Sequence, residues 1–205
     1  MNLMKYVAVL AAVITALMAN YLYDAYQAGE KRESEAYAAR QEADPINVRI
    51  FKETKAKAET GDTDAQHSLG YQYSEGRGVA KDIVLATEWW RTSAMQGNAR
   101  AQTTLALLYT ENDKGVKKNL VEAAKLFRMA ARQSDPLSLQ VLADCYQNGN
   151  GVVRDDIEAY AYYALSSIRF GGKCHYQEKL EKEMTREQIE AGLKRAKELQ
   201  KEIKD

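Results

Sequence analysis

The sequence repeats itself three times between residues 61 and 170, with a period of 36 to 37 residues. Corresponding positions carry the same residue in every unit: Leu69, Leu105 and Leu142; Tyr73, Tyr109 and Tyr146; Gly78, Gly115 and Gly151; Ala86, Ala123 and Ala159. One unit of this length cannot bury its apolar face alone, whereas stacked neighbours can. The repeat therefore predicts units that pile up in order, so that residues one period apart occupy equivalent environments.

Each unit is predicted to consist of a helix, a short glycine-containing turn and a second helix. Both helices of every unit begin at a residue type that is preferred at helix N-caps: Asp62, Asn98 and Asp135 for the first helix, and Asp82, Asn119 and Asp155 for the second. The spacings from Asn119 to Glu122 and from Asp155 to Glu158 predict reciprocal capping. The second unit carries one extra residue before Gly115.

These features predict an all-α fold. We expect an α/α solenoid of about three helix-turn-helix repeats with N- and C-terminal capping helices, preceded by an N-terminal hydrophobic helix. Thr185 and Gln188 have the spacing of a capping box at the start of the last helix. The predicted segments are a membrane anchor or uncleaved signal segment (1–23), a polar stalk (24–45), an N-terminal capping helix (46–60), repeat 1 (61–96), repeat 2 (97–133), repeat 3 (134–170) and C-terminal capping helices (171–205).

The repeat resembles the Sel-1-like repeat, a relative of the tetratricopeptide repeat. The matching signature is AQ-x-x-LG-x-x-Y-x-x-G-x-GV-x-x-D, followed by A-x-x-WW and a closing A-x-x-G, and residues 61–97 match it almost completely. The second unit replaces Gly70 by Ala106, and the third begins with SDPLSLQ. The resemblance covers residues 46–205. It implies a helical fold and a protein partner, but it does not imply a particular activity.

The N-terminal segment carries no charged residue from Tyr6 to Tyr23. A helix of that length spans about 27 Å, close to the hydrocarbon core of a bilayer. The possible cleavage sites place Leu17, Tyr23 or Tyr26 at the −3 position, so we favour an uncleaved anchor over a cleaved signal peptide. Lys5 precedes the span and an acidic segment follows it, which predicts an inner-membrane protein with its repeats in the periplasm; cleavage would release it there.

The composition argues against several function classes. Lys plus Arg and Asp plus Glu both number 29, so no net charge attracts nucleic acid. Two cysteines and two histidines supply poor material for a metal site, and we expect no cofactor and no catalytic residue. His67 and His175 are expected to lie far apart in the repeat order. Trp89 and Trp90 are expected to pack in the core, because Leu126-Phe127 and Tyr162-Tyr163 take their place in later units.

Two cysteines leave an alternative open. Some members of the resembling family join their helices by disulfides, and the predicted compartment permits a bridge between Cys145 and Cys174. Cys145 occupies the place of Gln72 and Leu108, however, which should face a groove, and two free thiols are the other possibility.

The predicted function is a non-enzymatic protein-protein interaction scaffold, tethered to the membrane through residues 1–23. Helical solenoids present the first helix of each unit along a concave face. The residues expected to line this groove and to bind a protein or peptide are Ser68, Tyr71, Gln72, Thr104, Leu107, Leu108, Val141, Asp144 and Cys145. Alternatively, these residues pack between repeats. Other possible functions are peptidoglycan binding, a hydrolase-like activity related to cysteine-rich relatives, or a structural stalk or homo-oligomer.

Overall fold

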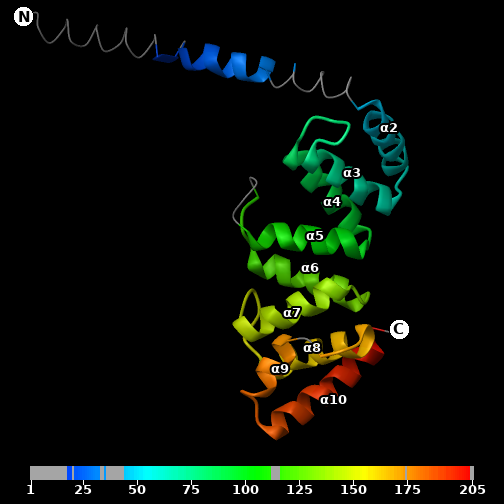
Figure 1. The fold of residues 1–205 in the computed structure, drawn as a ribbon, viewed down its shortest axis with the longest axis vertical. Coiled ribbons are helices and arrows are strands. Elements are labelled where there is room, and N and C mark those ends of the chain that lie inside the picture. The colour runs from blue at the N-terminus through cyan, green and yellow to red at the C-terminus, as the bar shows by residue number, and fades with distance from the viewer. Residues whose placement is uncertain are drawn as a thin grey trace, which may run out of the picture.

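The computed structural model describes residues 18–19, 21–32, 35, 44–111, 116–173 and 175–203. Within these ranges the chain is helical and contains no strand, which confirms the predicted all-α fold. The helices from Pro45 onward follow one another along the long axis of the molecule (Figure 1). They are α2 (Pro45–Glu59), α3 (Thr63–Glu75), α4 (Ile83–Met95), α5 (Ala99–Thr110), α6 (Leu120–Arg132), α7 (Pro136–Asn148), α8 (Asp156–Phe170), α9 (His175–Glu181) and α10 (Arg186–Glu202).

Successive helices pack on one another to form a solenoid. The pairs α3–α4, α5–α6 and α7–α8 form the three repeats, while α2 packs on α3 and α10 packs on α8. Leu69, Leu105 and Leu142 are all buried at equivalent places in these pairs. The prediction that residues one period apart share an environment is therefore confirmed for this leucine.

The N-caps of the first helices follow the sequence prediction. The carboxylates of Asp62 and Asp135 and the amide oxygen of Asn98 accept hydrogen bonds from the backbone three residues on, at 2.8–3.0 Å. The second helices are capped in the same way by Asp82, Asn119 and Asp155. Each cap satisfies a backbone N–H that the helix itself leaves unpaired, so each helix start is encoded locally.

The predicted reciprocal capping at Asn119 and Asp155 is wrong. The backbone N–H groups of these two N-cap residues donate instead to the carbonyl oxygens of Tyr109 and Tyr146, at 2.8 and 2.9 Å. The corresponding N–H of the first unit makes the same bond, to the carbonyl oxygen of Tyr73. A backbone hydrogen bond at the repeated tyrosine position thus ties the start of the second helix to the end of the first, and the N-cap N–H needs no glutamate.

Buried glutamines connect one unit to the next. The side-chain amide of Gln102 donates to the carbonyl oxygen of Ala94 at the end of α4, at 3.1 Å, and its own oxygen accepts from Gln133. Gln66 bonds Ala58 of α2 in the same way. Helix α2 therefore occupies the place that the second helix of a preceding repeat would take.

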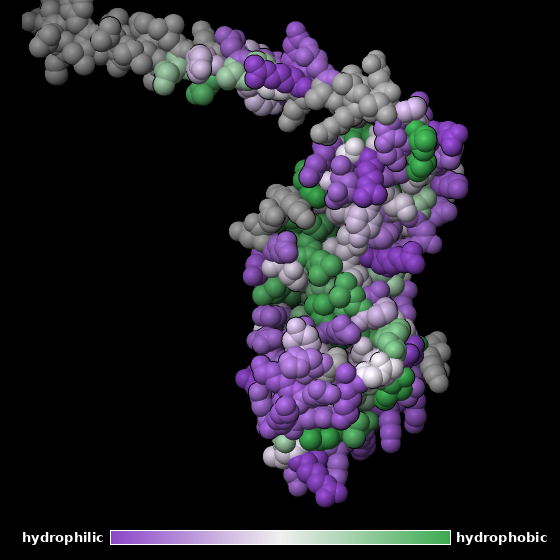
Figure 2. Space-filling view, viewed as in Figure 1, coloured by the Kyte–Doolittle hydropathy of each residue, from purple (hydrophilic) through white to green (hydrophobic). Residues whose placement is uncertain are grey.

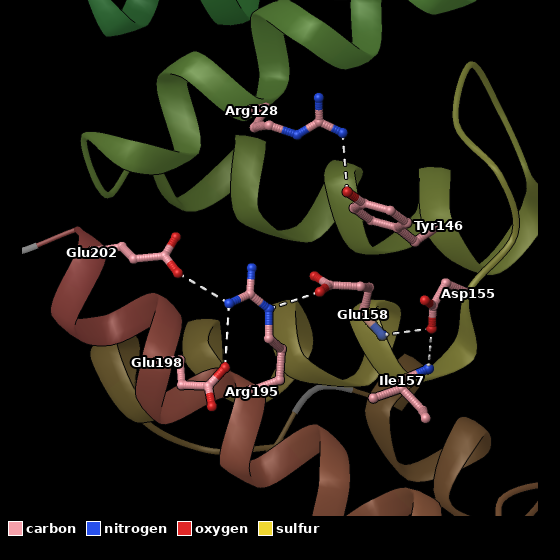
Figure 3. A network of polar contacts seen from close by, with 8 residues as sticks. All are labelled: Arg128, Tyr146, Asp155, Ile157, Glu158, Arg195, Glu198 and Glu202. Atoms are coloured by element: carbon pink, nitrogen blue, oxygen red, sulfur yellow. Dashed lines mark hydrogen bonds and ion pairs between the residues drawn. The ribbon is translucent and has the colours of Figure 1, made fainter.

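At the C-terminal end, Arg195 of α10 joins three carboxylates (Figure 3). Its guanidinium donates to Glu158 of α8 at 2.7 Å, to Glu202 at 3.0 Å and to Glu198 at 3.4 Å. The predicted capping box of Thr185 is confirmed: its hydroxyl accepts from the Gln188 N–H, and the Gln188 side chain accepts from the Thr185 N–H. These contacts begin α10 at a defined residue and hold it against the last repeat.

The predicted membrane anchor lies almost entirely outside the described residues, which include only 18–19 and 21–23 of it. Residues 21–32 are helical and exposed. In the part of the chain that the structure describes, no helix combines the length and the apolarity needed to cross a bilayer.

Candidate functional site

A groove of about 520 Å³ lies between α3 and α5, with α4 at its base. Its apolar wall consists of Tyr71, Trp90, Leu107 and Leu108, and we call it the Tyr71 groove. Tyr71 is 46% exposed and Leu107 is 40% exposed, whereas Trp90 and Leu108 are buried beneath them. The space-filling view shows apolar surface gathered over α5 and α6 (Figure 2). The groove is therefore an apolar surface between two repeats that a partner side chain could fill.

Tyr71 is held in place by its neighbours. Its hydroxyl and the hydroxyl of Thr104 lie 3.2 Å apart, and Thr104 also lies 3.2 Å from Nε2 of His67. The Tyr71 ring packs edge-on against the His67 ring at 4.9 Å and against Trp90 at 5.3 Å between centroids. Burial lowers the pKa of His67, with a smaller contribution from Arg100, so this imidazole is neutral at pH 7. Tyr71 thus has defined polar and aromatic partners next to a neutral imidazole.

The rim of the Tyr71 groove carries charges of both signs. Glu75, Lys81 and Glu111 line it around the apolar wall. An apolar centre inside a polar rim is the usual anatomy of a protein interface.

The predicted groove residues do not form one continuous stripe. Tyr71, Thr104, Leu107 and Leu108 line the Tyr71 groove, whereas Val141, Asp144 and Cys145 line a separate pocket of about 190 Å³ near the start of α6. The remaining two lie elsewhere. Ser68 is exposed and donates to the carbonyl oxygen of Asp64, and Gln72 donates to Thr54 of α2 at 3.3 Å.

Cys145 is a free, buried thiol that is 6% exposed. Burial, aided by the charge of Asp144, raises its pKa to about 11, so the thiol stays protonated at neutral pH. Cys174 lies outside the described residues, and a bridge between the two stays a prediction. A protonated buried thiol is a poor nucleophile.

Chemical groups of catalytic type are scattered. His67 lies on α3 and His175 on α9, at opposite ends of the repeats. Over the ranges that the structure describes, His, Cys, Asp and Glu form no group of three that could hold a metal ion. Trp90 is buried and Trp89 packs against the same apolar cluster, which confirms the prediction that this pair belongs to the core.

A repeated arginine–tyrosine pair escaped the sequence reasoning. The guanidinium of Arg91 on α4 donates to the Tyr109 hydroxyl at 3.1 Å, and that of Arg128 on α6 donates to Tyr146 at 3.0 Å. The two arginines are one period apart, so their recurrence was a usable signal. Each pair connects the second helix of one unit to the first helix of the next.

Comparisons with known proteins agree with this architecture. The chain is 31% identical over 106 residues to the ERAD-associated E3 ubiquitin-protein ligase component HRD3B of Arabidopsis thaliana, an alignment that covers 51% of this chain and 16% of that protein. It is 32% identical over 112 residues to an uncharacterized Sel1-like repeat-containing protein of Schizosaccharomyces pombe, covering 53% of this chain and 16% of the relative. The chain thus matches a small part of each of these longer proteins.

Among solved structures, the Sel1 repeat protein from Oxalobacter formigenes is 32% identical, with a TM-score of 0.56 over 60% of this chain and 50% of that chain. The family model of the Sel1 repeat matches residues 63–98, 99–135 and 136–167, which together make up about half of the chain. With three matched repeats and the stacked helix pairs that they form, the chain belongs to the Sel1 repeat family of helical scaffolds, which typically bind other proteins.

Proposed function

We propose that this protein is a non-enzymatic interaction module that binds a peptide segment of a protein partner in the Tyr71 groove. The supporting observation is the exposed pair Tyr71 and Leu107, which stands over a buried apolar floor between two repeats. Burial of a large apolar side chain contributes about 1.5–3 kcal/mol, so a partner that covers this pair gains useful affinity. Tyrosine is also enriched among the residues that dominate binding energy.

The fixed geometry of the wall supports the same proposal. Tyr71 contacts Thr104, His67 and Trp90, so the ring loses little conformational freedom when a partner covers it. Rigid aromatic surfaces bind with a small entropy cost. The Arabidopsis relative is by name a component of a ubiquitin-protein ligase, which fits a role inside a protein assembly.

Membrane tethering belongs to the proposal. The uncharged N-terminal stretch would anchor the chain in the inner membrane, with the repeats in the periplasm. A tether would confine module and partner to one surface and raise their effective concentration. Protease treatment of spheroplasts tests this orientation. Before treatment the protein should fractionate with the membranes, and the added protease should then digest the repeats from outside.

The groove is tested by affinity capture from membranes with the full chain as bait. The variant Tyr71→Ala/Leu107→Ser should lose a partner that the unaltered chain enriches, with affinity reduced at least about tenfold. The matched control is Phe170→Ala/Ile168→Ser, which removes an exposed aromatic and an exposed aliphatic side chain on α8. Equal capture by both variants would place the partner elsewhere, and turnover of muropeptides by the purified protein would contradict a non-enzymatic role.

A further inference from the structure

A second groove, of about 690 Å³, lies on the other side of Ile83, between the start of α4 and residues 116–119. We call it the Val84 groove. Its apolar part consists of Ile83, Val84 and Val116, and Val84 is 65% exposed. This groove shares Ile83 with the Tyr71 groove but has a different lining and a different charge.

The Val84 groove lies at a position that recurs in the repeat. In the first and third units, the turn between the two helices packs directly on the start of the helix that precedes the unit, which is α2 for the first unit and α6 for the third. A Cβ added to Gly78 would lie 2.9 Å from the backbone nitrogen of Val48, and one added to Gly151 would lie 2.9 Å from that of Val121. Both glycines also have a positive φ of 70–74°. Glycine is therefore needed at these positions both for the close approach of the two backbones and for the left-handed conformation. Val84 is the equivalent of Val48 and Val121, while residues 112–115 of the second unit lie outside the described part of the chain.

The rim of the Val84 groove is cationic. Among the described residues, Arg91, Lys117 and Lys118 line it together with a single carboxylate, Glu88. These residues give the groove a local excess of positive charge in a chain of zero net charge. Arg91 donates a hydrogen bond to the hydroxyl of Tyr109. Among the residues that the structure describes, no carboxylate forms an ion pair with any of these three cations, although several other basic residues on the surface have one.

The combination of an apolar floor and a cationic rim specifies an occupant. An acidic side chain alone would use the rim but leave Val84 exposed to water, and an apolar segment alone would bury the floor without pairing the cations. We propose that the Val84 groove binds a partner segment in which acidic residues alternate with aliphatic ones. This surface is separate from the Tyr71 groove, so the module would hold two segments, or two parts of one partner.

Charge complementarity makes the expected binding dependent on salt. Exposed ion pairs contribute about 0.2–1 kcal/mol each and are screened as ionic strength rises. Reversal of two of the three rim cations should therefore weaken binding by about tenfold at low salt. Removal of the apolar floor should weaken binding at every salt concentration, because burial of apolar surface does not depend on screening.

The experiment uses fluorescence anisotropy of the full chain with a labelled synthetic peptide of alternating Glu and Leu. Three companion probes are a Lys-Leu peptide, an all-Glu peptide and a single-stranded DNA oligonucleotide of the same charge. The test variants are Lys117→Glu/Lys118→Glu and Val84→Ser. The matched control is Lys52→Glu/Lys182→Glu, which makes the same change in net charge at exposed lysines outside the groove. Circular dichroism verifies that every variant is folded.

We expect the Glu-Leu peptide to bind most tightly of the four probes. Its affinity should fall about tenfold with Lys117→Glu/Lys118→Glu, and it should also fall with Val84→Ser. Binding should be unchanged by Lys52→Glu/Lys182→Glu and by the Tyr71 groove variant. Equal or tighter binding of the all-Glu peptide or the oligonucleotide overturns the proposal in favour of non-specific attraction of anions. Tighter binding of the Lys-Leu peptide, or an equal loss in the Lys52→Glu/Lys182→Glu control, overturns it as well.

Discussion

Gly70 of α3 lies directly against the indole of Trp90 on α4. A Cβ added at Gly70 would lie 2.5 Å from Cδ1 and 2.8 Å from Cε2 of that ring, well inside van der Waals contact. The indole N–H also donates to the carbonyl oxygen of His67 at 3.1 Å, so the ring cannot shift without losing a hydrogen bond. The substitution Gly70→Ala therefore forces a buried clash.

The magnitude follows from three contributions. Overpacking of a filled core costs about 1–3 kcal/mol, and strain on the Trp90 hydrogen bond adds about 1 kcal/mol. Alanine has a higher helix propensity than glycine, which offsets this cost by about 1 kcal/mol in the free energy of unfolding. Gly70→Ala should therefore lower the free energy of unfolding by about 1–3 kcal/mol.

The second repeat indicates how the damage can be relieved. There Ala106 packs in the place of Gly70 and Phe127 in the place of Trp90, and both are fully buried. In a Trp90→Phe background the smaller ring leaves room for the methyl group, so Gly70→Ala should become neutral or stabilising by up to about 1 kcal/mol. Trp90→Phe alone should cost about 1–3 kcal/mol for the lost contacts and the lost hydrogen bond.

A double-mutant cycle measures this coupling. Urea unfolding followed by circular dichroism on the four proteins should give a favourable interaction energy of about 2 kcal/mol. Because repeat arrays can unfold in steps, the fluorescence of Trp89 and Trp90 should be followed as a second probe where the variant retains it. The reasoning is refuted if Gly70→Ala costs the same, within about 0.5 kcal/mol, in both backgrounds.

Two further predictions concern ionisable groups. Burial raises the pKa of Cys145 to about 11, so the thiol ionises at a lower pH in the unfolded chain than in the folded protein. The contribution of Cys145 to stability should therefore be intact at neutral pH and fall as the pH rises toward 11. Urea unfolding of the wild type and Cys145→Ala at neutral and alkaline pH measures it, and parallel pH profiles would contradict the assignment. Arg195→Ala should lower the free energy of unfolding by about 1–2 kcal/mol, because Glu158 and Glu202 lose their shared cation. The loss should shrink in high salt and should be smaller for Arg195→Lys, which keeps the positive charge; an identical loss for both substitutions would contradict the assignment of the effect to charge.

The local features of the fold could be predicted from the sequence because each depends on residues close together in the chain. The N-caps at Asp62 and Asn98 need only the three residues that follow them. The reciprocal capping expected at Asp155 failed for the opposite reason. Its N–H finds the carbonyl oxygen of Tyr146, and Glu158 finds Arg195, 37 residues away. A capping rule that considers only neighbouring residues cannot predict a competing partner that tertiary packing supplies.

The candidate site was harder to predict than the fold. Helical periodicity placed Tyr71 and Leu107 on one face of their helices, and the structure brings both to one groove. It did not separate Cys145 and Val141 into another pocket, because the division depends on how far each unit shifts relative to the next. The Val84 groove could not be predicted from the sequence, because its cationic rim depends on helix α4 meeting residues 116–119.

The sequence by itself determined the repeat, the helix starts and the residues of the core, since a period of 36 to 37 residues imposes the same burial at every step. Only the tertiary structure decided which of the remaining polar and apolar side chains meet across the units. Those contacts depend on the small rotation from one helix pair to the next, and that rotation is the sum of many side-chain contacts rather than the property of any one segment.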